Sequence, residues 1–512
     1  LHFYTLMFYN ITIAGYKGVR NTMKREKFGS RLGFILVSAG CAIGIGNVWK
    51  FPYLCGEMGG AAFILIYLIF LLVMGIPVLV TEFAVGRASR YSVAAAYEKL
   101  EPEGSRWHHT KWIGIIGSYL LMMFYTTVGG WMLYYCYRSV TGEFVGASSE
   151  DIQNGFGQMI GSPSTMAFWT ILITVIGFAI CWFGIQKGVE RVTKVMMIAL
   201  LLIMIVLAAH SFFLEGAEKG IEFYLIPNFQ KMADIGIGNV IFGAMSQAFF
   251  TLSIGIGAMM IFGSYMGKDR SLTGEAINIT ILDTFVALMA GFIIIPACFA
   301  FNIQPDAGPN LIFITIPNLF AQMPGGRWWG ALFFLFLTFA AFSTLVAVFE
   351  NIISFDMDLL KWSRRKSVIV SMIAIIILSM PCVLGFNVLA DFQPVGAGST
   401  IMDLEDFIVS NNLLPLGSLG YLLFITRKNG WGWENFLAEV NTGKGLKFPA
   451  MLKGYVGYGI PLIIMIIYLK GYYDKFSGMS TAVFVTWMMI ALLLLGFVLF
   501  CALTSSKKKK TQ

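Results

Sequence analysis

The chain has 512 residues, of which 57% are hydrophobic and 12% charged, and its formal net charge is +8. Soluble domains carry about 25% charged residues, so this composition excludes an ordinary soluble protein and predicts an all-α polytopic membrane protein. We attribute the positive charge to membrane topology and expect no nucleic-acid partner.

Apolar runs near or above the ~20 residues needed to cross a bilayer recur along the chain. The first 22 residues are mixed in character, and Met23 is a natural start. We therefore expect 1–23 to be an N-terminal extension, with Leu1 not the native start. The twelve runs centre on residues 32–54, 59–84, 112–139, 166–185, 192–214, 236–265, 275–302, 327–355, 368–389, 403–425, 449–469 and 481–503.

Lysine and arginine are unevenly divided between the segments that join these runs. With the N-terminus inside, the inside segments hold 29 of the 36 Lys and Arg residues, including Lys507 to Lys510. This bias follows the positive-inside rule. We therefore expect a multi-pass protein of the plasma (inner) membrane, surrounded by the lipid bilayer, with both termini cytoplasmic.

Residue types that carry enzyme chemistry form no recognisable pattern. The seven cysteines include no Cys-x-x-Cys pair, and the four histidines form no metal cluster. Neither a phosphate-binding glycine-rich loop with a lysine nor a serine-hydrolase elbow occurs. We therefore expect no enzyme and no organic cofactor.

The tetrapeptide Ile-Gly-Ile-Gly occurs twice, at 43–46 and at 254–257, each time inside an apolar run. A glycine inside a helix costs about 1 kcal/mol relative to alanine, so both runs are predicted to break there. Secondary transporters use broken helices near the bilayer midplane to bind substrate and ions with free N–H and C=O groups. The alternative is that these glycines only allow close helix packing.

Polar residues accompany both predicted breaks. In the first, a half-helix starting near Gly46 would point its positive end at a carboxylate. Asn47 adds a side-chain oxygen for a hard cation, or caps that helix. In the second, Thr251 and Ser253 supply hydroxyl groups, and Phe250 can close over a ligand.

Three carboxylates lie in apolar surroundings, namely Glu82, Asp283 and Glu350. Each is costly inside a membrane unless it is paired or hydrated. Asp283 needs a cation or a hydrogen-bond donor. For Glu82, unwound backbone is an alternative partner.

These residues together resemble the neurotransmitter:sodium symporter family, in its bacterial amino-acid transporter branch with the LeuT fold. The resemblance covers roughly residues 24 to 430. The matching motifs are Arg31-Leu32-Gly33 through Gly44-x-Gly46-Asn47 and Phe51-Pro52 in the first run, Pro77, Glu82, Gly86 and Arg87 in the second, Tyr125 and Trp131 in the third, Gln247 to Ser253 in the sixth, and Ala340 to Thr344 with Asp358 in the eighth.

The resemblance implies about 12 transmembrane helices in a 5+5 inverted-repeat fold, with helices 1 and 6 broken. The repeats would be residues 24–215 and 216–430. Residues 431–512 would hold helices 11 and 12 and a basic cytoplasmic tail. Because the last two helices are expected to serve lipid or subunit contacts, a homodimer is one assembly to consider.

Two sodium ions, bound entirely by oxygen atoms, are implied in the same way. The first site would comprise the carbonyl of Ala42 with Asn47, Thr251 and Asp283, completed by the substrate carboxylate. The second would comprise the carbonyls of Gly40, Ile43 and Ala340 with the hydroxyls of Ser343 and Thr344.

The implied substrate lies between the two breaks. Its carboxylate would meet Tyr125 and the N–H groups of Ile45 and Gly46, and its amino group the carbonyls near Phe250, Thr251 and Ala42. Family members that carry amines without a carboxylate have an aspartate at the position of Gly44, so glycine implies an α-amino acid. The side-chain pocket would be lined by Leu121, Phe250, Ser253, Ile256, Thr344, Ala347 and Val348. None of these is ionisable, which favours a hydrophobic or aromatic side chain on the substrate. Glu82 and Gln247 would support the residues that contact the substrate and sodium.

The chain departs from the family pattern at the outer gate and the first sodium site. Lys50 replaces the usual arginine of the outer gate; its expected partner is Asp403, with Asp406 as the alternative. Asp283 stands where asparagine is usual, and Ala287 where chloride-dependent relatives carry serine. We expect Asp283 to supply a fixed negative charge that makes chloride unnecessary.

At the inner gate, Arg25 and Asp358 match the expected pair. The predicted function is sodium-coupled symport of a hydrophobic or aromatic α-amino acid into the cell by alternating access. An amino-acid-binding membrane sensor on a transporter fold is the alternative. A membrane transferase would require a catalytic metal or base motif, and a channel a repeated filter; neither pattern occurs.

Overall fold

The computed structural model describes residues 26–301 and 310–504, and all statements below refer to these ranges. The strand pairing found within them is an isolated bridge between Arg270 and Lys444, so this portion of the chain is helical, as predicted. The helices of the first half are α2 (Arg31–Ala42), α3 (Phe51–Glu57), α4 (Ala61–Phe70), α5 (Ile76–Ser89), α6 (Val93–Leu100), α7 (Lys111–Thr141), α8 (Ser149–Gly161), α9 (Pro163–Trp182), α10 (Arg191–Phe212), α11 (Glu218–Leu225) and α12 (Phe229–Ile235).

The second half continues the same architecture, from the second predicted break to the last span. Its helices are α13 (Ile237–Phe250), α14 (Ala258–Tyr265), α15 (Leu272–Ala300), α16 (Ile316–Gln322), α17 (Gly326–Phe355), α18 (Arg364–Leu384), α19 (Ile401–Ile408), α20 (Leu414–Thr426), α21 (Trp433–Val440), α22 (Ile460–Phe476) and α23 (Thr481–Leu503).

Ten continuous helical segments in the described ranges are long and apolar enough to cross a membrane. An eleventh consists of α2 and the helical segment Gly46–Glu57, which meet at a bend of 57°. The remaining expected run is the sixth in chain order, 236–265, and it is divided into two shorter helices, α13 and α14. The expected twelve spans are therefore reached only when both broken helices are each counted as one, and both predicted breaks are present.

Local signals in the sequence fix where two helices near the site begin. The Ser30 hydroxyl accepts a hydrogen bond from the Gly33 N–H at 2.9 Å and caps α2. Thr400 and Asp403 exchange side-chain and backbone hydrogen bonds as a capping box at the start of α19. Such caps satisfy N–H groups that have no partner inside the helix.

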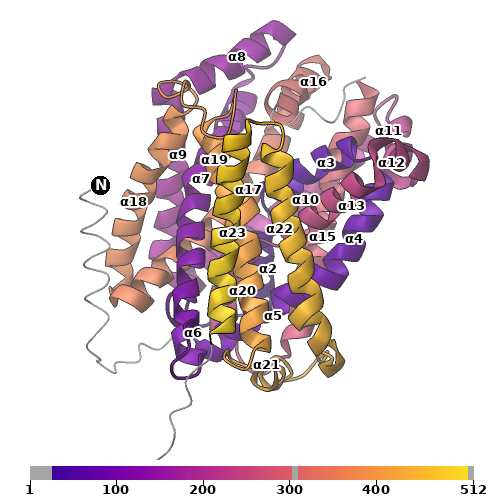
Figure 1. Cartoon of the computed structure of the whole chain (residues 1–512). Coiled ribbons are helices and arrows are strands. Elements are labelled where there is room, and N and C mark those ends of the chain that lie inside the picture. The colour runs from indigo at the N-terminus through magenta and orange to yellow at the C-terminus, as the bar shows by residue number, and fades with distance from the viewer. Residues whose placement is uncertain (1–25, 302–309, 505–512) are drawn as a thin grey trace, which may run out of the picture.

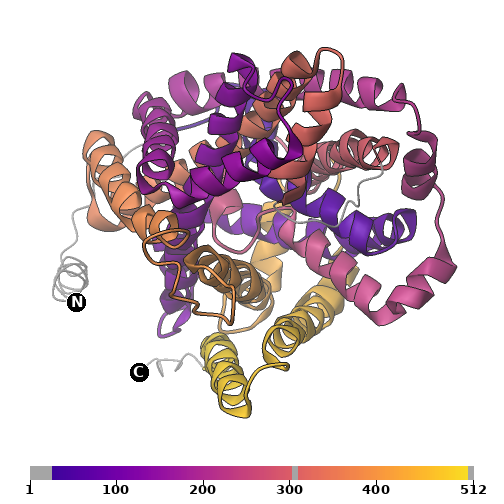
Figure 2. The same cartoon turned by 90° about the horizontal axis from the view of Figure 1, so that it is seen from above.

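The broken helices lie inside a shell of continuous ones. The long helices α7 and α17 pack along each other, and α17 also packs against α2. The half-helices α13 and α14 pack against α4 and α5 respectively. Figure 2 shows the indigo start of the chain enclosed by other helices, while the yellow pair α22 and α23 lies at the edge.

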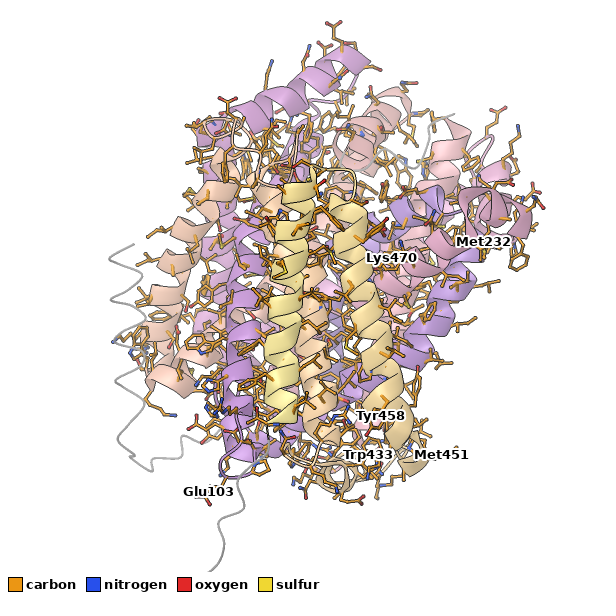
Figure 3. The ribbon with its side chains drawn as sticks, viewed as in Figure 1. Glu103, Met232, Trp433, Met451, Tyr458 and Lys470 are labelled. Carbon is orange, nitrogen blue, oxygen red and sulfur yellow. The ribbon has the colours of Figure 1, made fainter. Side chains whose placement is uncertain are left out.

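The ends of the bundle carry short helices that run across it. Figure 1 shows α8 and α16 at one end and α6 and α21 at the other. Glu103, Trp433, Met451 and Tyr458 lie toward the second end in Figure 3. We call this the inner end, following the expectation from the positive-inside rule that these loops lie in the cytoplasm.

Candidate functional site

The first break lies where α2 ends at Ala42. Ile43 takes an extended conformation, and helical turns resume at Gly46. The Asn47 Oδ1 atom accepts a hydrogen bond from the Gly44 N–H at 3.2 Å. Asn47 therefore bonds back to the turn that precedes the second half-helix, as the third residue of a capping box does.

The second break separates α13 from α14. Within it Ser253, Gly255 and Gly257 have φ values of +50°, +107° and +83°. A Cβ atom on Gly255 would overlap the carbonyl oxygen of Leu414 on α20. Glycine is thus required there both for its backbone conformation and for the close approach of α20.

The Glu82 side chain, on α5, holds the second break open. Its Oε2 atom accepts a hydrogen bond from Gly255 N–H at 2.8 Å, and Oε1 accepts from Met259 and Met260 at 3.1 and 3.3 Å. Glu82 is fully buried. Of the partners that the sequence left open for Glu82, the structure shows unwound backbone, together with N–H groups at the start of α14 that have no partner inside the helix.

Asn47, Thr251 and Asp283, implied for the first sodium site, meet between the two breaks. Asn47 Nδ2 lies 2.8 Å from Asp283 Oδ1 and 3.1 Å from Thr251 Oγ1. The Thr251 hydroxyl donates to Asp283 Oδ2 at 3.1 Å. All three residues are buried, as is Ala42 at the end of α2. A carboxylate, a hydroxyl and an amide are ligands that suit a hard cation, so these residues fit a sodium ion.

The second implied sodium site lies where α2 ends against α17. The Thr344 hydroxyl lies 3.2 Å from the carbonyl oxygens of both Gly40 and Ile43, and 3.3 Å from that of Cys41. One residue earlier, the Ser343 hydroxyl donates to the Ala340 carbonyl at 3.0 Å. The structure thus gathers the implied oxygen atoms, and adds the Cys41 carbonyl. The Cys41 carbonyl was not predicted as part of this site. The signal for it was the position of Cys41 next to Gly40 in the last turn of α2.

The space implied for the substrate carboxylate is bordered by Tyr125 on α7. The Ile45 N–H donates to the Tyr125 hydroxyl at 2.9 Å. A Cβ atom on Gly44 would overlap that hydroxyl and would lie 2.9 Å from Thr344 Oγ1. A Cβ atom on Gly46 would lie 3.2 Å from the Phe250 ring. Both glycines therefore face groups of the implied site closely enough to exclude a side chain.

The other implied pocket residues lie on α7, on α17 and in the second break. Leu121 precedes Tyr125 by one turn of α7, and Ala347 and Val348 follow Thr344 by one turn of α17. The Ile256 carbonyl accepts a hydrogen bond from Ser118 on α7 at 3.5 Å, which holds the second break against that helix. Leu121, Ile256, Ala347 and Val348 are all buried, while Ser253 is partly exposed.

The start of the second half-helix of the first broken span also contacts Gln247 of α13, which was expected to support the site. Gln247 Nε2 donates to the Gly46 carbonyl at 3.1 Å, and Gln247 is fully buried. This bond joins the outer halves of the two broken helices. A shift of one half is therefore transmitted to the other.

The expected pairing of Lys50 with Asp403 does not occur. The Asp403 carboxylate accepts hydrogen bonds from the Thr400 backbone and hydroxyl at 2.7 and 2.8 Å, because it completes the cap of α19. The Lys50 ammonium lies 4.0 Å from the centre of the Phe250 ring, and the acid whose charge acts on it is Asp406. Lys50 forms an ion pair with neither acid in the described residues, and of the two candidates it is Asp406 whose charge acts on it.

At the inner gate, Arg25 lies outside the described residues. Asp358 accepts a hydrogen bond from the Ser92 N–H at 2.6 Å. Phe28, in the segment before α2, packs against Phe34 and Tyr265, with ring centres 5.5 and 5.9 Å away. Phe28, Phe34 and Tyr265 therefore form an aromatic cluster beside the start of α2.

Three glutamates that the sequence did not single out attach residues 26–31, the segment leading into α2, to the rest of the protein. The Glu190 carboxylate accepts from the N–H groups of Gly29 and Ser30 at 2.6 and 3.1 Å. Glu275 binds Arg31 at 2.9 Å, and Glu26 accepts from Ile185 at 2.7 Å. These pairs join positions about 160 or more residues apart, so no local pattern could reveal them.

Glu350, the third intramembrane carboxylate, pairs with Arg364 at the inner end. Arg364 Nη1 lies 3.1 Å from Glu350 Oε1, which also accepts from the Tyr265 hydroxyl at 2.9 Å. The same guanidinium lies 3.6 Å from Glu26. The buried charge is therefore neutralised by the helix that follows it, and takes no part in the implied sodium sites.

Comparison with known proteins gives a consistent result. The family model described as "Sodium:neurotransmitter symporter family" matches residues 25–155 and 150–508. The "Uncharacterized sodium-dependent transporter YhdH" of Bacillus subtilis is 35% identical over 449 residues, covering 87% of this chain and 98% of the relative. An uncharacterized sodium-dependent transporter of Haemophilus influenzae is 31% identical over 463 residues, covering 88% and 99%. The crystal structure of MhsT in complex with L-phenylalanine is similar with a TM-score of 0.78 and 37% identity, covering 87% of this chain and all of that one.

Proposed function

Because the chain belongs to the sodium:neurotransmitter symporter family, we propose that it couples the entry of sodium to the uptake of a hydrophobic or aromatic α-amino acid. Its relatives are sodium-dependent transporters and not enzymes. The amino-acid substrate, the two sodium sites and independence from chloride are the elements of the proposal that go beyond that kinship.

The observation that carries the proposal is the crowding around Gly44. A Cβ atom there would overlap the Tyr125 hydroxyl, so the backbone lies directly against that group, and glycine supplies no carboxylate of its own to bind an amine. The Ile45 N–H and the Tyr125 hydroxyl are both capable of donating to a carboxylate at this place. A substrate that carries its own carboxylate matches this arrangement, whereas a simple amine does not.

The apolar pocket lining supports a hydrophobic or aromatic side chain. Leu121, Ile256, Ala347 and Val348 offer no group that would pair with a charged substrate. A charged side chain left unpaired there would lose its hydration without compensation. The similar transporter MhsT was solved with L-phenylalanine bound, which agrees with this preference.

The proposed mechanism is alternating access around a site between the two breaks. Sodium at the Asn47, Thr251 and Asp283 cluster would contact the substrate carboxylate, so that neither binds fully without the other. Tyr125 and Phe250 would close the site from the outside, and Arg25 with Asp358 from the inside. The membrane potential adds about 2.3 kcal/mol for each net charge moved through 100 mV.

Uptake into proteoliposomes tests this proposal. We expect labelled hydrophobic or aromatic amino acids to accumulate under an inward sodium gradient and not under an equal potassium gradient. The plasma (inner) membrane orientation with both termini cytoplasmic is tested by labelling single cysteines from either side. Binding without accumulation would indicate the alternative, an amino-acid sensor, and the absence of both would refute the substrate assignment.

The charge of Asp283 leads to a prediction about chloride. We expect wild-type uptake to be the same with and without chloride, because Asp283 supplies the buried negative charge beside sodium. Asp283→Asn removes this charge and should lower uptake in chloride-free medium at least about tenfold, the equivalent of about 1.4 kcal/mol. The measurement is the initial rate of sodium-driven uptake in gluconate and in chloride buffers.

Asp391→Asn provides the matched control, because it removes an exposed carboxylate between α18 and α19. It should leave uptake unchanged in both buffers. Normal chloride-free uptake by Asp283→Asn would show that chloride independence has another cause.

A further inference from the structure

Helix α19 carries three acidic residues with different surroundings. Asp403 is exposed and caps the helix, while Asp406 accepts from the Ser410 hydroxyl at 2.6 Å and acts on Lys50. Glu405, between them, is only 4% exposed, whereas Asp406 is partly exposed. Neither the sodium sites nor the gates account for Glu405.

Glu405 lies against α7 and α18, the two long helices on which α19 packs. Both of its carboxylate oxygens are buried without a hydrogen-bond partner among the described residues. The Cys382 thiol of α18 interacts with Glu405, and the Thr127 hydroxyl of α7, which also lacks a hydrogen-bond partner among the described residues, interacts with the same thiol. The other charged groups of α19 are Asp403 and Asp406, and no ion pair joins Glu405 to a cation of the described residues.

A bare carboxylate in such surroundings is strongly disfavoured, because burial removes its hydration and no cation replaces it. A bound sodium ion would need several oxygen ligands, and the side chains here offer only the two of Glu405 and that of Thr127. A proton needs a single acceptor atom. The surroundings therefore favour a neutral carboxylic acid.

We propose that Glu405 is a proton-binding site that is occupied when α19 packs as it does here and empties when the outer end of the helix moves into water. The proton comes from the outer solution, binds one carboxylate oxygen, and returns to the same solution. No net proton transport is required. The proposal uses the proposed function only in taking α19 as a component of the outer gate.

The neighbouring Asp406 links this site to the outer gate. Successive residues of a helix point about 100° apart, so a roll of α19 that brings water to Glu405 also displaces Asp406 from Lys50. The closed arrangement holds the proton more tightly than the open one. Raising the external pH should therefore oppose closure of the gate and slow uptake.

The first test uses thermal unfolding of the purified protein, which needs no substrate. Glu405→Gln keeps the shape of the neutral acid and cannot ionise. We expect the melting temperature of the wild type to fall, relative to that of Glu405→Gln, between about pH 5 and about pH 8, because the unfolded chain releases this proton above about pH 4.3 while the folded protein still holds it. Equal pH profiles for the two proteins would overturn the proposal.

The second test measures sodium-driven uptake against external pH at fixed internal pH. Uptake by the wild type should fall several-fold toward alkaline pH, whereas Glu405→Gln should show a flatter profile. Asp391→Asn should keep the wild-type profile. If Glu405→Gln is poorly expressed, Glu405→Leu serves instead, since it also cannot ionise and should remove the pH dependence of unfolding. An unaltered uptake profile in Glu405→Gln would contradict the link to the gate.

The two experiments separate this inference from the proposed function. If no amino acid is taken up but the pH dependence of unfolding disappears in Glu405→Gln, the proton site stands and the transport proposal fails. If uptake proceeds and the unfolding profiles coincide, the reverse holds.

Discussion

Gly44→Ala is expected to abolish sodium-driven uptake, lowering its initial rate about a hundredfold or more. The added methyl group would overlap the Tyr125 hydroxyl and press against Thr344 Oγ1, 2.9 Å away. Both hydroxyls are held by the first break, Tyr125 through Ile45 and Thr344 through the end of α2. Overpacking of this kind costs about 1–3 kcal/mol, and here the displaced groups are the ones implied in binding.

The measurement is the initial rate of uptake into proteoliposomes at matched protein content. Gly238→Ala is the control, because Gly238 lies on α13 of the other broken helix and nothing lies within 4 Å of the place its Cβ would take. Gly238→Ala should transport normally. Normal transport by Gly44→Ala would mean that the substrate does not occupy the space beside Tyr125.

Glu82→Gln is expected to destabilise the protein and to stop transport. The glutamate accepts three backbone N–H groups around the second break. A glutamine offers one oxygen and one NH2 group, so at least one N–H would face another donor inside the membrane. Each buried donor left without a partner costs about 1–3 kcal/mol. The break would then lose the geometry that places Thr251 beside Asn47.

We expect a lower melting temperature in detergent together with a loss of substrate binding. Glu98→Gln, which changes an exposed glutamate on α6, should alter neither property. If Glu82→Gln kept its stability and lost only transport, the carboxylate would have a direct role in the cycle that its hydrogen bonds do not explain.

The breaks were the feature of the fold most open to prediction from the sequence. Two glycines in the middle of an apolar run conflict with a continuous helix, and the conflict is visible within each Ile-Gly-Ile-Gly tetrapeptide. The ligand positions then followed from the resemblance, because Asn47 and Thr251 match its motifs and Asp283 stands where the family usually carries asparagine. The structure brings these side chains within hydrogen-bonding distance of each other.

The partner of Lys50 was harder to predict, since Asp403 and Asp406 lie three residues apart on one short helix. The deciding signal was local and was overlooked. Thr400 followed three residues later by an acid is the pattern of a capping box, which occupies Asp403 and leaves Asp406 for the gate.

The contacts of Glu190, Glu275 and Arg364 could not be predicted at all. They depend on which helices lie next to residues 26–31, and that is decided by packing across the whole bundle. The pairing of Glu350 with Arg364 likewise depends on how sharply the chain turns between α17 and α18.

The attachment of residues 26–31 has a consequence for the rate of opening toward the cytoplasm. Glu190 and Glu275, from two distant regions of the sequence, bind Gly29 and Arg31 of this segment, and the segment's own Glu26 binds the backbone of Ile185. Such ties can break in succession, so the segment can peel away in stages, with no single step having to release all of them. The attachments would then be released one after another, and the rate of release would depend on ionic strength, because two of the three attachments include exposed charges.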